Sequence, residues 1–593
     1  MKRFSQRWAL VFPYLKRYRS YILSGLFCVI LSTAMDQVSP WMIKIMVDNL
    51  TSGQPFTALY MPLAIILATT ISSALLLYMQ RLWVIQSSRK IEFEIRQDLF
   101  ATLQKQPKTF FDKNALGDLM SNATNDLDRV RDFVGVVILH LARMICMSVF
   151  VISCIWMLHP VLAILGIVPS LVLPLFVNRL LKKMHSLYGN IQKNLGLLNS
   201  FVQDTISGIQ VVKAYGKEEI FQNKFESSSN ELRKNSLRVA LFTSGMWPLI
   251  GILGALGILL VVWYGARMVI AQQITIGTLT AALIYLLKLQ FPMAGLGWVA
   301  NLMQRSNAAM DRLLDLQGRL GKKGFTSVHE HASPPLKPQD ISKGHDSDLD
   351  LRGLSFRYGN GPQVLDGIDL KIPFGSSLGI VGPTGSGKST LLHIICGIYL
   401  PPPRQLYLAA KPREDYSEKE WMSWFALAPQ DGFLFSRSIR DNILLGQSEQ
   451  TLSTVEEAGK LSGFSRDLPQ IQMGYEALLG ERGINLSGGQ RQRVGLARAI
   501  FSHSSVLCLD DTLSSLDTET ESQVLANLRK IALDRTLIII SHRYSSVRFC
   551  DTIIFLDKGR IAEAGTHHEL MNARGLYAQV YDKQMISMDL ERA

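Results

Sequence analysis

Residues 507–517, LCLDDTLSSLD, place two adjacent carboxylates, Asp510 and Asp511, at the end of an apolar run. A carboxylate at the end of a buried strand can hold Mg²⁺. A second carboxylate beside it can orient a water molecule for attack on a phosphate. The pair therefore predicts metal-dependent phosphate chemistry.

Residues 382–389, GPTGSGKS, match the phosphate-binding pattern G-x-x-x-x-G-K-[ST] in full. An apolar strand-like run, SLGIV, precedes them and a helical run, STLLHIICGI, follows. Glycines let backbone N–H groups wrap the phosphates, and the helix N-terminus adds positive potential. We therefore expect ATP here, with Lys388 at the β- and γ-phosphates and Ser389 on Mg²⁺. The predicted nucleotide contacts are Gly382, Pro383, Thr384, Gly385, Ser386, Gly387, Lys388, Ser389 and Thr390.

A second glycine-rich stretch, LSGGQ at 486–490, precedes the helical run QRQRVGLARAI. A serine–glycine start can be only a helix cap. It can also hold an anion, because the first N–H groups of a helix are free and its dipole is positive there. The predicted nucleotide contacts in this stretch are Ser487, Gly488, Gly489 and Gln490.

The first half of the 593-residue chain is apolar enough to cross a membrane, and 48% of all residues are hydrophobic. A spanning helix needs about 20 mostly apolar residues. Residues 49–80, 144–178, 239–266 and 268–287 carry no Asp, Glu, Lys or Arg, and His159-Pro160 predicts a tight turn within the second run. Six spans are predicted, near 20–47, 57–80, 135–158, 161–183, 241–266 and 275–300.

The net charge of +13 follows the same pattern. Lysine and arginine are frequent in the N-terminal tail and in segments 81–131 and 179–238, and rare in the short turns. Positive segments stay on the cytoplasmic side. We therefore expect a multi-pass protein of the cell's inner (plasma) membrane, in contact with lipid, with the N-terminus and the C-terminal domain cytoplasmic. Long helices should extend into the cytoplasm, and no nucleic-acid partner is needed to explain the charge.

Four ionisable residues fall inside the predicted spans: Asp36, Lys44, Arg143 and Lys288. A charge in lipid is costly, so each is a candidate for substrate contact, for a structural ion pair or for a residue that faces a water-filled cavity. After the membrane domain, predicted as 1–315, residues 316–349 are rich in Gly, Pro, Ser and His and predict a linker. Alternating strand-like and helix-like runs then predict an α/β domain over 350–585 with a largely parallel sheet.

The phosphate loop, LSGGQ, LCLDD and SSLD together resemble the nucleotide-binding domain of an ATP-binding cassette (ABC) transporter. With six preceding spans, the chain resembles a bacterial half-transporter of the multidrug or lipid exporter type. The resemblance implies an α-helical membrane domain fused to a C-terminal α/β P-loop domain. It also implies an ATPase coupled to export of amphipathic or hydrophobic drugs, lipids or peptides.

The resemblance also implies roles for single residues. Tyr358 would stack on adenine, Gln430 would contact Mg²⁺, and Asp510 would hold Mg²⁺ through water. Asp511 would be the general base, and His542 would contact the γ-phosphate.

Further stretches resemble family loops. Asp517 in SSLD would lie in the loop that crosses from one subunit to the other. GERG at 480–483 resembles a loop that touches the coupling helices. FFDKNALGDLMSNATNDLDRVR and ISGIQVVKAYGKEE resemble the two cytoplasmic coupling regions.

In this family two nucleotide domains sandwich ATP, and LSGGQ of one chain faces the phosphate loop of the other. The base position usually holds glutamate, and Asp511 is one methylene shorter. A misplacement of about 1 Å can cost about a hundredfold in rate. We therefore expect this site to bind ATP but hydrolyse it slowly, in a heterodimer with a second half-transporter. A homodimer with Asp511 as a working base, and an ATP-gated regulatory or channel-like protein, are the alternatives.

Overall fold

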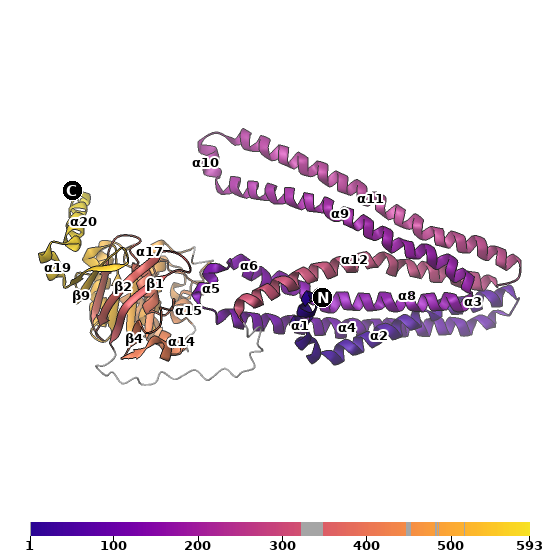
Figure 1. Cartoon of the computed structure of the whole chain (residues 1–593), viewed down its shortest axis with the longest axis horizontal. Coiled ribbons are helices and arrows are strands. Elements are labelled where there is room, and N and C mark those ends of the chain that lie inside the picture. Colours follow the sequence, from indigo (N-terminus) through magenta and orange to yellow (C-terminus); the bar gives the residue numbers. More distant parts are fainter. Residues whose placement is uncertain are drawn as a thin grey trace. The chain divides into compact units, whose positions relative to one another are not determined.

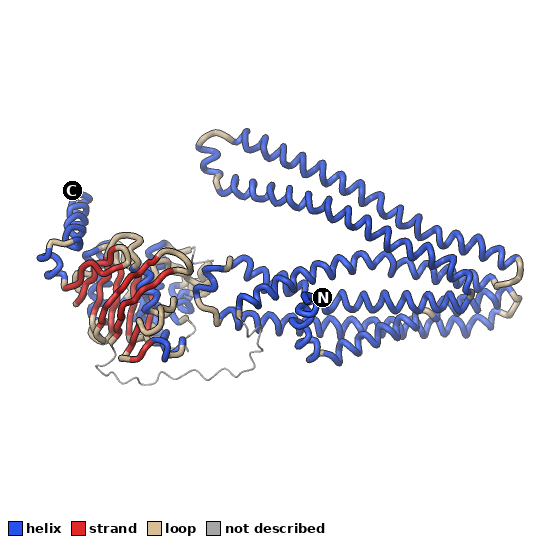
Figure 2. The backbone as a smooth tube through the Cα atoms, viewed as in Figure 1, coloured by secondary structure: helices blue, strands red, loops and turns tan. Residues whose placement is uncertain are grey.

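The computed structural model describes residues 2–321, 348–445, 447, 452–480, 483, 485–514 and 516–592. The chain forms two compact units: Met1–Gln106 with Asn114–His331, and Pro107–Lys113 with Ala332–Ala593. Helices make up the first unit, and all described strands belong to the second (Figure 2). The segment 107–113, which the sequence placed in the membrane domain, is thus grouped with the nucleotide unit.

Long helices dominate the first unit, and α9 and α11 run side by side, joined through α10 (Figure 1). The turn predicted at His159-Pro160 is present, because His159 is extended and caps the helix that Pro160 begins. The helices of this unit are α1 (Lys2–Arg17), α2 (Arg19–Asp36), α3 (Val38–Thr51), α4 (Tyr60–Gln104), α6 (Leu116–Ser121), α7 (Leu127–Asp132), α8 (Ile138–Leu158), α9 (Pro160–Ser207), α10 (Ile209–Ala214), α11 (Glu218–Ile270) and α12 (Ile276–Leu320).

All six predicted spans fall on helices. Within the described residues, three helical stretches are long and apolar enough to cross a membrane: Arg19–Thr51, Phe56–Gln104 and Leu116–Leu158. The other predicted spans overlap shorter apolar stretches, Pro160–Pro169, Ala255–Ile270 and Ile276–Gln290. The predicted cytoplasmic extensions are helical as well, since α4, α9 and α11 continue well past the apolar stretches.

The first span is broken at Gln37, between α2 and α3. Pro40 has no N–H to donate to the carbonyl of Asp36 four residues earlier. The ammonium of Lys288 on α12 donates to that carbonyl at 2.5 Å and pairs with the Asp36 carboxylate at 3.1 Å. The Tyr285 hydroxyl donates to the next carbonyl, that of Gln37, at 2.6 Å. Two of the four charged residues predicted inside spans therefore pair with each other. One of them, Lys288, also supplies the hydrogen bond that Pro40 cannot donate.

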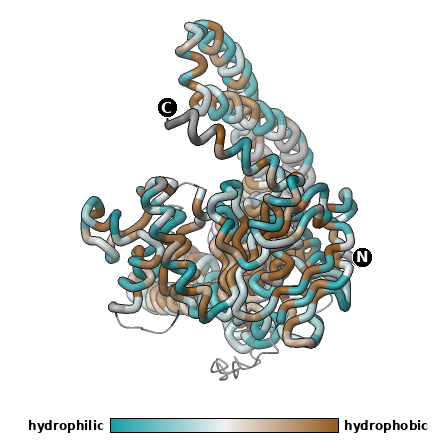
Figure 3. Tube along the Cα trace, turned by 90° about the vertical axis from the view of Figure 1, so that its left-hand side faces the viewer, coloured by the Kyte–Doolittle hydropathy of each residue, from teal (hydrophilic) through white to brown (hydrophobic). Residues whose placement is uncertain are grey.

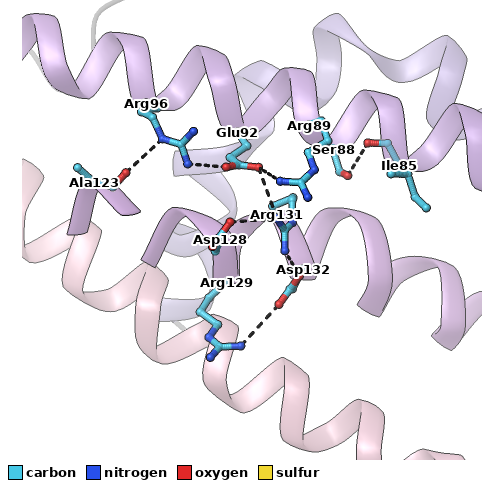
Figure 4. A network of polar contacts seen from close by, with 10 residues as sticks. All are labelled: Ile85, Ser88, Arg89, Glu92, Arg96, Ala123, Asp128, Arg129, Arg131 and Asp132. Carbon is cyan, nitrogen blue, oxygen red and sulfur yellow. Dashed lines mark hydrogen bonds and ion pairs between the residues drawn. The ribbon is translucent and has the colours of Figure 1, made fainter. Parts of the chain in front are cut away.

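Polar side chains join α4 to α7 (Figure 4). The Glu92 carboxylate is only 5% exposed and contacts Arg96 at 2.5 Å, Arg89 at 3.1 Å and Arg131 at 3.8 Å. Arg131 also pairs with Asp132 on its own helix, at 2.9 Å. A buried carboxylate is tolerated where several cations satisfy it. The network therefore fixes α7 against α4.

The second unit contains two sheets. Apolar residues, brown in Figure 3, are frequent along the chain of this unit. The larger sheet has the order β10-β9-β3-β8-β7-β6, and its neighbours are parallel except for β10 and β9. This confirms the predicted largely parallel sheet. The smaller sheet, β2-β1-β4-β5, is antiparallel and was not predicted. The strands are β1 (Leu349–Arg357), β2 (Gln363–Ile372), β3 (Ser377–Val381), β4 (Leu406–Leu408), β5 (Lys411–Pro412), β6 (Phe425–Ala428), β7 (Val506–Asp510), β8 (Thr536–Ile540), β9 (Thr552–Asp557) and β10 (Arg560–Gly565).

Two predicted boundaries shift. Helix α12 continues to Leu320, five residues into the segment predicted as linker, and residues 322–347 of that linker lie outside the described ones. At the other end, α20 runs past the predicted boundary at 585. The helices of the second unit are α5 (Lys108–Lys113), α13 (Lys388–Ile395), α14 (Glu418–Ser423), α15 (Ile439–Leu444), α16 (Leu452–Leu461), α17 (Gly488–Phe501), α18 (Thr518–Ile531), α19 (His567–Ala573) and α20 (Leu576–Arg592).

Candidate functional site

The phosphate loop joins the buried strand β3 to α13, as predicted. Gly382 has φ +146°, and a Cβ there would lie 2.1 Å from the carbonyl oxygen of Leu556. Gly387 has φ +102°, and a Cβ there would lie 2.8 Å from the Leu365 side chain. Only glycine fits both positions, because other residues rarely adopt such φ values and a Cβ would clash.

Side chains in the loop leave polar groups available for an anion. The Lys388 ammonium donates to the carbonyls of Gly382 and Pro383, both at 2.9 Å, which leaves one of its three donors. The Ser386 hydroxyl is buried and has no hydrogen-bond partner among the described residues. Burial lowers the pKa of Lys388, while Asp511 and Asp510 oppose that shift. These residues fit the phosphates of a nucleotide.

The first carboxylate of the pair lies beside the phosphate loop. The Ser389 hydroxyl on α13 donates to the Asp510 carboxylate at 3.0 Å. Burial raises the pKa of Asp510, and the bond from Ser389 opposes this. A hydroxyl and a carboxylate oxygen at this separation are suitable oxygen ligands for Mg²⁺. Two of the three residues predicted as metal ligands, Ser389 and Asp510, therefore lie together, and the third is Gln430.

The second carboxylate is held differently. Asp511 has φ +47°, a left-handed conformation that is unfavourable for a residue with a Cβ, and is 6% exposed. Its backbone N–H donates to the carbonyl of Ile540 on β8 at 3.0 Å. Its carboxylate accepts the backbone N–H of His542 at 3.3 Å. The structure therefore brings the predicted base and the predicted γ-phosphate histidine together, with one carboxylate oxygen already bonded to protein.

The LSGGQ stretch begins a helix, as predicted. Ser487 is the N-cap of α17, and its hydroxyl accepts from the backbone N–H of Gln490 at 3.2 Å. The Gln490 side chain accepts the Ser487 N–H in return, at 2.9 Å. Ser487 and Gly488 are exposed. Gln490, predicted to contact nucleotide, therefore completes a capping box, and the exposed start of the helix is formed by Ser487 and Gly488, followed by the half-buried Gly489.

Tyr358 reaches the phosphate-loop helix. Its hydroxyl lies 3.0 Å from the Thr390 hydroxyl on α13, and its ring meets the Tyr399 ring edge-on at 5.1 Å. The Tyr399 hydroxyl donates to the Asp112 carboxylate of α5 at 2.8 Å. Asp112 is also paired with Lys108 at 2.9 Å. A 40% exposed Tyr358 beside the phosphate loop is suitably placed to stack on a base.

The remaining predicted residues lie on surface turns. Gln430 lies shortly after β6 and is exposed. The Gln430 backbone carbonyl accepts a hydrogen bond from the Gln492 side chain at 3.1 Å. Asp517 caps α18 by accepting the Thr520 N–H at 2.9 Å, and this bond lowers the pKa of Asp517. Glu481 and Arg482, in the predicted GERG loop, lie outside the described residues.

Comparison with known proteins gives the family. The family model described as "ABC transporter transmembrane region" matches residues 22–293, and that described as "ABC transporter" matches residues 365–514. The Escherichia coli (strain K12) "Multidrug resistance-like ATP-binding protein MdlA" is 31% identical over 604 residues, which cover 100% of this chain and 98% of that protein. This chain belongs to the ABC transporter family.

Two further proteins are similar to this ABC transporter. An "ATP-dependent lipid A-core flippase" of Syntrophus aciditrophicus (strain SB) is 29% identical over 94% of this chain and 91% of that protein. The solved "Structure of a bacterial Atm1-family ABC exporter with ATP bound" has TM-score 0.75 and 23% identity, covering 95% of this chain and 99% of that one. That likeness gives the exporter fold. An ABC transporter of this architecture binds ATP, couples its hydrolysis to transport across a membrane and works as a dimer.

Sequence reasoning gave no nucleotide-site role to three residues beside the predicted site of the transporter. Tyr399 contacts the Tyr358 ring, and Asp112 accepts the Tyr399 hydroxyl. Gln584 of α20 donates to the His542 carbonyl and accepts the Tyr544 N–H. Asp112 lies in a stretch predicted only as a coupling region, and none of the three lies in a phosphate-binding pattern, so their partners, distant in sequence, gave no local signal.

Proposed function

We propose that this chain is one subunit of a heterodimeric ABC exporter that moves amphipathic or hydrophobic compounds out of the cell. Its own ATP site binds Mg²⁺-ATP and hydrolyses it slowly. The partner, a second half-transporter, carries glutamate at the position of Asp511. Two of the relatives are a multidrug resistance-like protein and a lipid A-core flippase, which supports drugs or lipids as the substrate class.

Each predicted site residue has a role in this proposal. Lys388 and the phosphate-loop N–H groups bind the phosphates, Tyr358 stacks on the adenine, and His542 contacts the γ-phosphate. Ser389 and Asp510 would hold Mg²⁺, with Gln430 reaching it when the site closes. Bound Mg²⁺ would neutralise charge on the phosphates.

The observation that carries the proposal is the environment of Asp511. A general base must orient a water molecule beside the γ-phosphate, and its carboxylate must reach that water. Asp511 is shorter than glutamate, and it already accepts the backbone N–H of His542 at 3.3 Å. We infer that its carboxylate supports the His542 backbone more than it orients water.

The LSGGQ stretch of this chain supports a difference in hydrolysis between the two ATP sites of the dimer. Ser487 and Gly488 are exposed and Ser487 caps its helix, so the LSGGQ stretch is ready to complete the phosphate site of a partner. A weak site on this chain and a competent site on the partner then share the same dimer.

The test is the substitution Asp511→Asn in the complex purified from its own membranes through a tag on this chain. If this site is weak, total ATPase activity should stay within about twofold, whereas loss of a working base would cost about a hundredfold or more. Asp511→Glu should raise turnover at this site. The native mass and composition are measured on the same sample. A particle holding two copies of this 66.4 kDa chain, inactivated by Asp511→Asn, would refute the proposal and favour a homodimer with Asp511 as the base.

A further inference from the structure

The turn that carries His542 depends on side chains from elsewhere for its backbone hydrogen bonds. The His542 N–H donates to the Asp511 carboxylate, and the Arg543 N–H donates to the Ser541 hydroxyl at 3.0 Å. The His542 carbonyl accepts from the Gln584 amide at 2.6 Å, and the Tyr544 N–H donates to the same amide at 3.1 Å. The turn is therefore fixed by specific side-chain contacts.

Gln584 lies on α20, which packs against the same turn. The Tyr544 ring is 3% exposed and lies 5.4 Å from the ring of Tyr577, a fully buried residue of α20. The Tyr577 hydroxyl lies 2.9 Å from His567 Nδ1, and its N–H donates to Glu563 at 3.1 Å. Helix α20 is thus anchored one and a half turns or more before Gln584, which places the amide beside the turn.

We propose that Gln584 is a positioning residue for His542. Its amide uses both its donor and its acceptor on one turn, and the Asp511 carboxylate holds the same residue from its N–H. With both backbone groups of His542 bonded, only the side-chain torsions remain free to aim the imidazole. The C-terminal helix thereby sets how well the histidine meets a γ-phosphate. The inference rests on the proposed role of His542, but not on the substrate or the identity of the partner.

A positioning role predicts a loss that is selective for ATP over ADP, because only ATP has a γ-phosphate. The purified full complex is labelled on ice with azido-ATP, and unlabelled ATP or ADP competes for this chain. Gln584→Ala should weaken ATP competition by roughly three- to tenfold, the range for losing one or two neutral hydrogen bonds. ADP competition should stay within about twofold, because adenine and β-phosphate contacts are untouched.

Three variants make the test specific. Gln579→Ala, at an exposed glutamine on the same helix, should leave both nucleotides unchanged. Gln584→Glu keeps the acceptor for Tyr544 but places a negative charge against the His542 carbonyl, so it should match Gln584→Ala. His542→Ala should itself lower ATP preference, and adding Gln584→Ala to it should cause no further loss.

Contradictory results are distinguishable. Equal losses for ATP and ADP, no loss, or full additivity with His542→Ala would each overturn a positioning role for Gln584. If His542→Ala leaves ATP preference unchanged, the proposed role of His542 fails, and the inference fails with it. If the unmodified chain is not labelled at all, the proposed ATP site itself is wrong.

Discussion

Two loops lie at the carboxyl ends of strands β3 and β7 of one sheet, yet they differ in backbone conformation. They are the phosphate loop, residues 382–389, and the carboxylate loop, which follows β7 and begins with Asp511. The phosphate loop places its positive φ angles on glycines, among them Gly382 and Gly387. The carboxylate loop places one on Asp511, at φ +47°. A left-handed conformation costs about 1–2 kcal/mol for a residue with a Cβ and almost nothing for glycine.

This difference separates binding from hydrolysis. The first loop has glycines at its positive φ angles, a lysine with one donor to spare and a Ser386 hydroxyl with no partner among the described residues, and all three suit a bound phosphate. The second has a short carboxylate in a costly conformation that is bonded to the backbone of His542. We therefore predict that changes in the first loop affect affinity for ATP, whereas changes in the second affect turnover at this chain's own site.

The largest expected effect comes from a Cβ in the phosphate loop. Gly382→Ala would bring Cβ to 2.1 Å from the Leu556 carbonyl oxygen at φ +146°, so the loop must move. We expect ATP affinity to fall by about a hundredfold or more, corresponding to about 3 kcal/mol of strain and lost contacts. Competition against azido-ATP labelling of this chain measures it.

Gly385→Ala is the matched control in the same loop. Gly385 has φ +82°, but a Cβ there would have nothing within 4 Å. It should therefore cost only the conformational strain, about 1–2 kcal/mol. If the two variants bind ATP equally poorly, the close approach at Gly382 does not determine the binding.

The pH dependence of Mg²⁺ binding gives the next largest effect. Burial raises the pKa of Asp510, so a proton competes with Mg²⁺ at a higher pH than at an exposed carboxylate. Below the raised pKa, Mg²⁺ affinity should fall by about tenfold per pH unit, because one proton is displaced per ion. The sign for stability is opposite: without Mg²⁺, the folded state binds this proton more tightly than the unfolded state does. This contribution therefore becomes more favourable as pH falls through the raised pKa.

Mg²⁺-dependent ATP retention, measured as the pH is lowered stepwise from neutral, checks this prediction. Asp510→Asn should abolish the pH-dependent part. An equally steep pH dependence in Asp510→Asn would assign it to another group.

The two loops also differ in how much of them could be predicted. Strand β3, the glycines and Lys388 are neighbours in sequence, so the motif predicts their geometry. The bond from Gln584 to His542 spans 42 positions, and that from Tyr399 to Asp112 spans 287. No local pattern encodes such contacts, because they depend on how distant elements pack.

The membrane unit shows the same limit. The sequence identifies Asp36 and Lys288 as charges inside spans, and an ion pair is one of three interpretations, beside substrate contact and a water-filled cavity. Their pairing across 252 positions, and the proline break that it closes, required the structure. Periodicity and charge therefore predict elements and candidate residues, whereas partners depend on tertiary packing.

A smaller effect is expected from a change at Tyr399, which lies beside Tyr358 near the phosphate loop. Tyr399→Phe keeps the edge-on ring contact and removes the hydroxyl bond to Asp112. ATP affinity and basal ATPase activity should stay within about twofold, because the aromatic contact is kept. Dye transport per ATP should fall about threefold to fivefold, because the bond from the Tyr399 hydroxyl to the Asp112 carboxylate of α5 is lost. Asp112 is part-exposed, so solvent lowers the worth of this charge-assisted bond to about 1 kcal/mol.

Transport and hydrolysis are measured together in proteoliposomes with an amphipathic dye. Asp112→Asn still accepts the Tyr399 hydroxyl and should have the smaller effect, whereas Asp112→Ala should match Tyr399→Phe. Equal transport per ATP in all three variants would show that this contact does not transmit closure of the site.

The smallest expected effect tests whether non-glycine residues at positive φ are costly in general in this unit. Strands β4 and β5 form a hairpin whose two-residue turn is Ala409-Ala410, with φ +51° and +60°. Such turns favour Asn-Gly, because both residues are left-handed. Ala-Ala lacks this sequence signal, so the sequence alone did not predict the turn. Ala410→Gly should raise the free energy of unfolding by about 0.5–1 kcal/mol, since strain relief exceeds the entropy that glycine adds to the unfolded chain.

The control is Ala526→Gly, at an exposed position inside α18, which should lower stability by about 1 kcal/mol. Calorimetric unfolding of the nucleotide unit within the full complex separates the two variants by the sign of their shift in Tm. If both substitutions lower Tm, the turn at Ala410 carries no relievable strain. The φ of Asp511 would then be weak support for a costly carboxylate loop, and the case for slow hydrolysis would depend on the shorter side chain and its bond to His542.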